Sequence, residues 1–205
     1  MAGLRLGIFG GTFDPPHVGH LILAEEACSN LRLDRLLWVL TSKPPHKHNQ
    51  TITSLEMRLQ MLQAAILGNP RFELSRVDID RNPPHFAVDT LRLLRAQFPA
   101  ETLVYLMGGD SLRDLPTWHD PAGFLSAADS LGVMRRPGID LDLTLLEKKL
   151  PGLQAKLEIF EAPLLEISST RIRKLVSRNG PFRYYLAPAV YDVIRQNRLY
   201  RSQVL

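Results

Sequence analysis

Residues 4–20 read LRLGIFGGTFDPPHVGH and contain the features that decide the fold. Residues 4–9 are largely apolar and predict a short buried strand, and residues 10–16, GGTFDPP, predict a tight turn. Residues 17–30 then predict a helix, because Leu21, Ala24 and Cys28 recur on one helical face. A buried strand that leads through a glycine-rich turn into a helix is the usual beginning of an α/β domain.

The turn and the helix start are suited to binding an anion. Gly10 and Gly11 leave the backbone open to a phosphate, and the first turn of a helix offers free N–H groups and a positive dipole end. His17 and His20 are three residues apart, so they share one face of the helix. Gly19 lowers helix propensity, which predicts close packing or binding at that point. The stretch matches neither G-x-G-x-x-G nor a P-loop, and the two histidines alone make a weak zinc site.

Strands and helices alternate along the rest of the chain. We expect further strands at residues 36–40, 72–79, 102–107, 131–134 and 157–160, and helices at residues 53–67, 87–98, 168–176 and 188–198. A capping box formed by Thr53 and Glu56 begins the first of these helices, and residues 108–111 are expected to form a turn. The pattern predicts an α/β, doubly wound parallel sheet with a small C-terminal helical part, in a single domain over residues 1–205. Ligands should bind at the carboxyl ends of the strands.

Composition excludes several classes of protein. The 205 residues are 45% hydrophobic and 22% charged, as in a globular protein, and Cys28 is the only cysteine. An internal disulfide and a cysteine-built zinc site are therefore excluded, and we expect a reducing, cytoplasmic location. No apolar run reaches the roughly 18 residues of a membrane span. The net charge of +4 suits an anionic substrate, but the basic residues are not interleaved with aromatic ones on a strand, so we expect no nucleic-acid partner.

GGTFDPPHVGH resembles the signature of the nucleotidyltransferase superfamily that carries a His-x-Gly-His motif. The whole chain is similar to the bacterial nicotinate-mononucleotide adenylyltransferases. The similarity rests on these further segments, quoted in chain order: PPHK at 44–47, RNPP at 81–84, DTL at 89–91, GGDS at 108–111, Trp118, RRPG at 135–138 and ISSTRIR at 167–173.

The resemblance implies which residues bind ATP. His17 and His20 would contact its phosphates, with Gly10, Gly11, Thr12 and Phe13 as a backbone cradle, and we expect His20 to affect the rate most. Ser168, Ser169, Thr170 and Arg171 would form a second phosphate site at a helix start. Lys47 would be a mobile cation that closes over the phosphates. The catalytic residues implied are therefore His17, His20, Lys47 and Arg171, and Mg²⁺ would enter with ATP rather than on protein side chains.

The resemblance also implies how nicotinate mononucleotide is held. Asp110 would accept from ribose hydroxyls, Trp118 would stack on the pyridine ring, and Lys47 and Arg136 would contact the nucleotide. Where the family usually has Ser-Tyr-Thr, this chain has His85, Phe86 and Ala87. The family's threonine hydroxyl is therefore missing, although backbone N–H groups and His85 can still bind a carboxylate.

The implied reaction is ATP-dependent adenylyl transfer to nicotinate mononucleotide, which gives nicotinate adenine dinucleotide and pyrophosphate in NAD biosynthesis. The acceptor phosphate is already largely ionised near pH 7, so we expect positioning and charge neutralisation rather than a covalent intermediate. Other acceptors stay open: nicotinamide mononucleotide, phosphopantetheine, or a small phosphoalcohol that takes a cytidylyl group. A non-catalytic nucleotide- or RNA-binding protein is the alternative from another class. The oligomeric state is left open by the sequence.

Overall fold

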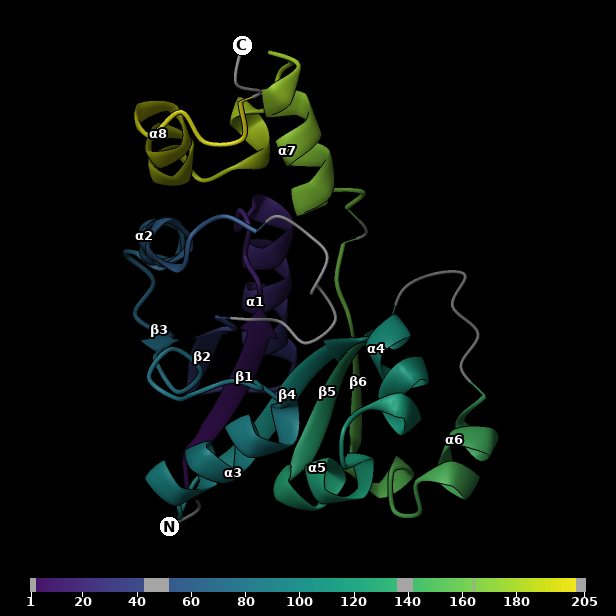
Figure 1. Ribbon diagram of the computed structural model, residues 1–205. Helices are drawn as coiled ribbons and strands as arrows, with labels where there is room; N and C mark the ends of the chain where they lie inside the picture. Colours follow the sequence, from purple (N-terminus) through teal and green to yellow (C-terminus); the bar gives the residue numbers. More distant parts are fainter. Residues whose placement is uncertain (1–2, 43–51, 136–141, 164, 202–205) are drawn as a thin grey trace.

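A six-stranded, all-parallel sheet forms the centre of the molecule in this computed structural model (Figure 1). The structure describes residues 3–42, 52–135, 142–163 and 165–201. The strands are β1 (Arg5–Gly11), β2 (Arg35–Leu40), β3 (Phe72–Ser75), β4 (Thr102–Gly108), β5 (Ser130–Arg135) and β6 (Leu157–Glu161), in the order β3-β2-β1-β4-β5-β6. The order reverses between β1 and β4, which confirms the predicted doubly wound sheet and puts the topological switch point beside the glycine-rich stretch.

Helices cover both faces of the sheet. They are α1 (Val18–Asn30), α2 (Leu55–Ile66), α3 (Ala87–Gln97), α4 (Gly109–Asp114), α5 (Pro121–Ala127), α6 (Leu143–Lys149), α7 (Ser169–Ser177) and α8 (Pro188–Gln196), with short 3-10 helices η1 (Leu115–Thr117), η2 (Gln154–Lys156) and η3 (Arg183–Tyr185). Alternation along β2 shows how the layers form: Trp38 packs with α1, α2 and α8 on one face, and Val39 packs with α3 and α4 on the other. Trp38, within the apolar segment 36–40 that was predicted as a strand, is fully buried.

Beyond the glycine-rich stretch, four local predictions differ from the structure. Helix α2 is capped by Ser54, whose side chain accepts from the N–H of Met57, rather than by Thr53. Strand β3 ends at Ser75 instead of continuing to residue 79, because residues 77–79 turn toward α3. Residues 109–111 begin helix α4 rather than forming a turn, and α5 and α6 were not predicted. These helices are short, so hydrophobic periodicity gives little signal for them.

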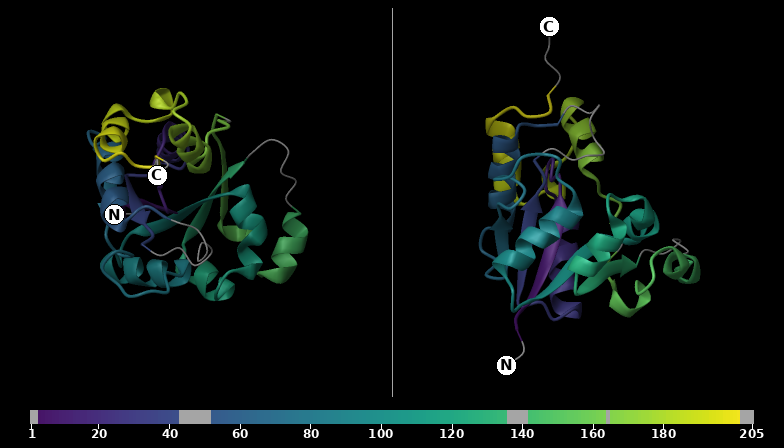
Figure 2. Two further views of the ribbon diagram at one scale, coloured as in Figure 1. Left: turned by 45° about the horizontal axis from the view of Figure 1, so that its top comes forward. Right: turned by 60° about the horizontal axis from the view of Figure 1, so that its bottom comes forward.

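The C-terminal residues form a small helical lobe above the sheet. Figures 1 and 2 show α7 and α8 over the carboxyl ends of the strands, at the opposite end of the molecule from the N-terminus. Helix α8 packs on α2, and Val190, Val193 and Ile194 of α8 join the core on that face. The lobe therefore closes one side of the edge at which ligands bind in such sheets. None of the helices among the described residues is long and apolar enough to cross a membrane.

Candidate active site

The two glycines of the signature belong to strand β1 rather than to the turn after it. Gly10 pairs with Val39 and Gly11 with Leu40 of β2, so the turn begins at Thr12. A Cβ atom on Gly10 would lie 3.2 Å from the hydroxyl of Tyr105, and one on Gly11 would lie 2.8 Å from the ring of Phe13. Side chains at these two positions would therefore crowd Tyr105 and clash with Phe13 at the end of the strand. This packing adds to the predicted need for a backbone that a phosphate can approach.

The backbone of Phe13 forms a sharp turn, and its side chain is buried in the core. Its φ of 47° lies in the left-handed region, which bulky residues seldom adopt. The side chain is only 3% exposed and contacts the rings of Phe9 and Trp38. Burial of the ring offsets the backbone strain and fixes the direction of the chain toward α1. Only the backbone of Phe13 is therefore placed to contact a nucleotide.

His17 and His20 form one unit at the start of α1. His17 is the N-cap residue, the two rings stack with centroids 3.6 Å apart, and Nδ1 of His20 accepts a hydrogen bond from the N–H of His17 at 3.1 Å. Burial lowers the pKa of His17 to about 4, and burial together with the neighbouring His17 lowers the pKa of His20 well below its usual value. Both rings are therefore neutral near pH 7. Because Nδ1 of His20 is an acceptor, its proton is on Nε2.

Gly19 gives the ring of His17 its room. A Cβ atom at this position would lie 3.1 Å from Nδ1 and 3.2 Å from Cε1 of that ring. The prediction that something packs close to the backbone here is confirmed, and the group that does so is His17 itself. The glycine of the His-x-Gly-His motif therefore has a packing role, because the lack of a side chain at this position lets the two imidazoles stack.

The histidines line a pocket on the α7 side of the sheet, which we call the His17 pocket. Its walls come from α1, β5, the segment after β6 and the start of α7: His17, Gly19, His20, Leu23, Met134, Ala162, Pro163, Leu165, Ile167, Ser168 and Ser169. Ser168 caps α7 by accepting from the N–H of Arg171, and the hydroxyl of Ser169 donates to the carbonyl of Pro15 at 2.9 Å. Arg173 donates to the carbonyl of Asp14 at 2.7 Å. The start of α7 is thus fastened to the turn before His17.

Thr170 and Arg171 lie on the outer side of this helix start. Oγ1 of Thr170 accepts from Arg173 at 3.3 Å, and the exposed guanidinium of Arg171 lies over the ring of Tyr185 at 5.9 Å. Neither residue is among those that line the His17 pocket. The expected roles of Thr170 and Arg171 at the phosphates stay predictions.

A second pocket, the Trp118 pocket, opens on the α3 side of the sheet. Its lining joins the ends of β1, β2 and β4 to the loop before α3 and the residues after η1: Ile8, Gly10, Gly11, Thr12, Val39, Thr41, Asp78, His85, Phe86, Ala87, Thr90, Tyr105, Trp118 and His119. Phe86 and His119 stack with ring centroids 3.9 Å apart. Trp118 stands edge-on to Phe124 at 5.2 Å. The structure therefore brings His85, Phe86, Ala87 and Trp118 together, as the sequence predicts.

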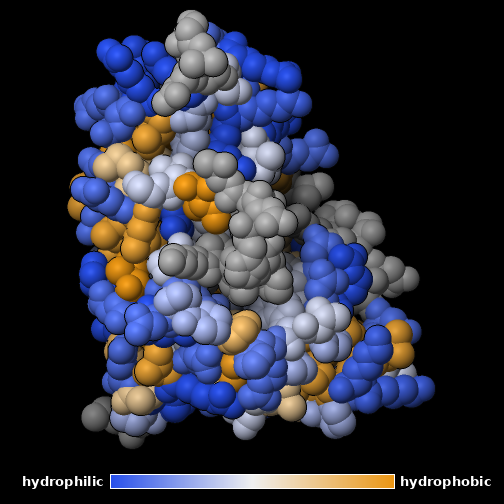
Figure 3. Space-filling model, viewed as in Figure 1, coloured by the Kyte–Doolittle hydropathy of each residue, from blue (hydrophilic) through white to orange (hydrophobic). Residues whose placement is uncertain are grey.

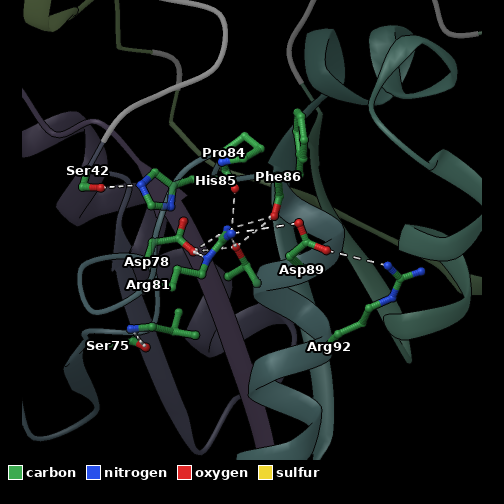
Figure 4. A network of polar contacts seen from close by, with 11 residues as sticks. Ser42, Ser75, Asp78, Arg81, Pro84, His85, Phe86, Asp89 and Arg92 are labelled. Atoms are coloured by element: carbon green, nitrogen blue, oxygen red, sulfur yellow. Dashed lines mark hydrogen bonds and ion pairs between the residues drawn. The ribbon is translucent and has the colours of Figure 1, made fainter.

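A polar network fixes the wall of this pocket that precedes α3 (Figure 4). Thr90 of α3 donates to the buried carboxylate of Asp78 at 2.7 Å, and Arg81 donates to the same oxygen at 3.0 Å. Arg81 also donates to the carbonyl of Pro84 at 2.8 Å, and the imidazole of His85 is hydrogen-bonded to the hydroxyl of Ser42. These contacts hold the backbone of residues 84–86 in place, so the unusual His85 is a fixed part of the wall.

Like Thr170 and Arg171, three further predicted site residues lie apart from the pockets or outside the described residues. Asp110 is exposed in the first turn of α4 and forms an ion pair with Arg113 at 3.4 Å; it lines neither pocket. Its contact with a ribose therefore stays a prediction, which the lining of the two pockets does not support. Lys47 and Arg136 lie outside the residues that the structure describes.

Arg58 is a structural residue that sequence reasoning missed. It is 2% exposed, and its guanidinium donates to the carbonyls of Thr12, Thr41 and Ser42 at 2.7–3.1 Å, while Nε donates to that of Thr53. One buried cation thus connects the segments that follow β1 and β2. Burial lowers the pKa of Arg58, and the nearby carboxylate of Asp14 opposes this effect. The only signal in the sequence is an arginine on the apolar face of α2.

Tyr105 and His119 were also missed as pocket residues. Tyr105 lines the Trp118 pocket, and burial raises the pKa of its hydroxyl, so the phenol stays protonated. A tyrosine within the apolar strand β4 is the signal that points to it. His119 follows Trp118 directly, and its role appears only when the fold stacks it on Phe86.

The two pockets lie on opposite sides of the end of β1. Ile8, Val39 and Tyr105 of the Trp118 pocket pack on the α3 side of the sheet, whereas Met134 and Ile167 of the His17 pocket pack on the α1 side. One pocket offers aromatic rings and the other offers imidazoles and a helix start. Paired pockets of this kind, at the switch point of a doubly wound sheet, are typical of an α/β enzyme that binds nucleotides.

Comparison with known proteins narrows this class. A model of the family described as cytidylyltransferase-like matches residues 8–175. The probable nicotinate-nucleotide adenylyltransferase of Thermomicrobium roseum is 44% identical over 198 residues, covering 97% of this chain and 92% of that protein. The corresponding protein of Roseiflexus sp. is 41% identical, covering 98% of this chain and 100% of that protein. The chain therefore belongs to the cytidylyltransferase-like family and, within it, to the nicotinate-nucleotide adenylyltransferases.

A solved structure gives the same fold. Plasmodium falciparum nicotinic acid mononucleotide adenylyltransferase, complexed with NaAD, superimposes with a TM-score of 0.78 at 20% sequence identity. The match covers 96% of this chain and 97% of that one, so the sheet and the C-terminal lobe are shared over nearly the whole length.

Proposed function

We propose that this protein transfers the adenylyl group of ATP to nicotinate mononucleotide, giving nicotinate adenine dinucleotide and pyrophosphate in NAD biosynthesis. The observation that carries the proposal is the pair of pockets on either side of Gly10–Thr12, one with stacked imidazoles and one with aromatic walls. ATP would occupy the His17 pocket and the pyridine nucleotide the Trp118 pocket. The acceptor phosphate and the α-phosphate of ATP would then meet at the end of β1.

The chemistry follows from the state of the groups at this point. An oxygen of the acceptor phosphate attacks the α-phosphorus, and the bond from that phosphorus to the β-phosphate oxygen breaks to release pyrophosphate. No strong base is required, since the acceptor is already ionised. Neutral His20 would donate its Nε2 proton in a hydrogen bond to a phosphate oxygen, and the N–H groups that follow Gly11 would do the same. Positioning and preorganised donors are therefore the contribution of the protein.

Mg²⁺ is expected to enter with the triphosphate. Among the described residues, no three His, Cys, Asp or Glu side chains come together as a metal site, and the His17 pocket offers nitrogen groups and hydroxyls rather than carboxylates. Mg²⁺ prefers oxygen ligands, which the phosphates supply. When bound, the ion neutralises the charge of the leaving group. Lys47 and Arg171 are proposed to assist, as the resemblance implies.

Residues 1–205 are proposed to act as one nucleotidyltransferase domain, because α1 near the start of the chain and α7 near its end both line the His17 pocket. A cytoplasmic location stays a prediction that rests on the single cysteine.

The choice of acceptor is tested by direct comparison. Purified protein with ATP and Mg²⁺ would receive nicotinate mononucleotide, nicotinamide mononucleotide or phosphopantetheine, and pyrophosphate release would be measured. We expect the nicotinate compound to have the highest kcat/KM, since the backbone of residues 84–86 is held rigidly for a carboxylate. Equal or faster turnover of nicotinamide mononucleotide would contradict this assignment. His85 and Phe86 in place of the usual serine and tyrosine make that outcome the alternative to test.

A further inference from the structure

Positive charge is concentrated in the C-terminal lobe. Residues 167–201 contain eight lysine and arginine residues and one acidic residue, Asp192, although the whole chain carries a net charge of only +4. The remainder of the chain is therefore net negative. Apart from Arg173, which holds the carbonyl of Asp14, the basic residues of the lobe are exposed: Arg171, Lys174, Arg178, Arg183, Arg195, Arg198 and Arg201. Hydrophilic residues cover this end of the molecule in Figure 3.

In the part of the chain that the structure describes, none of these cations forms an ion pair with a carboxylate. Every ion pair among the described residues joins side chains between Arg5 and Glu158, and most arginines of the sheet domain take part in one. Unpaired like charges on a small lobe repel each other and raise its free energy. An anionic ligand bound to the lobe would offset this repulsion.

Aromatic rings line a groove between the arginines. The groove is formed by Ile167, Gly180, Pro181, Phe182, Arg183, Tyr184, Tyr185 and Tyr191. Arg171 lies over Tyr185 at one side, and Arg183 and Arg195 lie 5.4 and 5.8 Å from the ring centre of Tyr191 at the other. Tyr184 is 89% exposed. The linear sequence hides this interleaving, because the fold brings together residues from α7, η3 and α8.

We propose that the lobe binds single-stranded nucleic acid, with a base stacked on the exposed ring of Tyr184 and the backbone phosphates on the surrounding arginines. Aromatic stacking beside a positive surface is how proteins bind single strands without sequence preference. An anionic membrane fits less well, since Tyr184 is the only exposed large hydrophobic side chain of residues 167–201, and peripheral membrane binding uses buried aliphatic area. The expectation of no nucleic-acid partner rested on the absence of interleaving along a strand, and the folded lobe supplies it in another way.

The test measures binding of a fluorescent oligoadenylate of about 12 nucleotides to the full chain by anisotropy, at several salt concentrations. We expect Kd to rise with salt, and Arg183→Gln to weaken binding and to reduce the salt slope by about 0.7. Tyr184→Ala should weaken binding roughly tenfold, whereas Tyr184→Phe, which keeps the ring, should bind like the parent. Arg92→Gln is the matched control, because Arg92 is an exposed arginine that pairs with Asp120 in the sheet domain.

Two further measurements test whether the oligonucleotide binds to this surface rather than in the nucleotide pockets. Saturating ATP, which would engage Arg171, should weaken oligonucleotide binding only slightly, and Arg183→Gln should keep the parent's rate of pyrophosphate release. Complete displacement by ATP, a Kd that is the same for Arg183→Gln and Arg92→Gln, or binding to phosphatidylserine vesicles without binding to the oligonucleotide would each overturn the proposal. Failure of adenylyl transfer itself would leave these binding measurements unaffected.

Discussion

The phenol of Tyr200 donates a hydrogen bond to Oδ1 of Asp14 at 2.7 Å and so connects the far end of the described chain to the turn before His17. Asp14 is 4% exposed, and its other carboxylate oxygen accepts from the N–H of Thr53 at 3.2 Å. Burial and the adjacent carboxylate both raise the pKa of Tyr200, so the phenol remains a proton donor. The position of the turn before His17 therefore depends on residues remote in sequence.

Removal of this hydroxyl tests that dependence. We expect Tyr200→Phe to lower the free energy of unfolding by about 1–3 kcal/mol, because a buried carboxylate loses a donor. Turnover should fall by several-fold, since the turn before His17 loosens. Urea unfolding and pyrophosphate release measure the two effects. Tyr184→Phe is the control, because the side chain of Tyr184 is exposed to solvent and its hydroxyl is not buried. Equal unfolding free energies for both variants would contradict the argument.

His20 should carry the largest effect on rate among the described residues. His20→Ala removes a neutral N–H donor from the His17 pocket, and loss of one preorganised donor costs on the order of 100-fold or more in kcat. ATP binding should change much less, because the interaction strengthens in the transition state. Steady-state kinetics with both substrates check this. A variant with near-parent kcat would refute the assigned role, and His17→Ala combined with His20→Ala should be less than additive because the two rings act as one unit.

We expect activity to require Gly19 because it leaves space for the ring of His17, and not because it helps to form the helix. Gly19→Ala improves helix propensity but places a Cβ atom 3.1 Å from the ring of His17, so we expect activity to fall at least tenfold while the fold is kept. The measurement is a double-mutant cycle. In a His17→Ala background the ring is gone, so Gly19→Ala should cost nothing further in kcat. The same loss in both backgrounds would show that the glycine serves another purpose.

The lowered pKa of His17 predicts how stability depends on pH. The pKa is about 4 in the folded protein and near 6.5 in the unfolded chain, so the unfolded state binds the extra proton between these values. The contribution of neutral His17 is therefore fully present above pH 6.5 and falls by about 3 kcal/mol as the pH approaches 4. His17→Gln, which does not titrate, should lose less free energy of unfolding than the parent between about pH 7 and 5. Parallel curves would contradict the shift.

Some parts of the molecule follow from local sequence and others do not. The buried strands and the start of the helix predicted at residues 168–176 were predictable because hydrophobic pattern and capping chemistry act over a few residues. The early end of β3 and the helix at Gly109 were not, since tertiary packing decides such boundaries.

The same distinction holds for the site. His17, His20 and Trp118 stood out because a motif or an aromatic residue in a loop marks them. Arg58 and Tyr200 did not, because their roles come from contacts with Thr12 and Asp14 that exist only after the chain has folded. The role of Gly10 in opening the backbone to a phosphate stays a prediction, and the structure adds that the hydroxyl of Tyr105 leaves little room for a side chain there.

The two-pocket arrangement predicts that different mutations change the KM values of the two substrates. Trp118→Leu removes an aromatic wall from the Trp118 pocket, so we expect KM for nicotinate mononucleotide to rise about tenfold, with KM for ATP nearly unchanged. Ser169→Ala releases the start of α7 from Pro15 beside the His17 pocket and should raise KM for ATP instead. Each variant is the control for the other, measured with the second substrate saturating. If either change raised both KM values alike, ATP and the acceptor would not occupy separate sides of β1, and the assignment of the pockets would have to be abandoned.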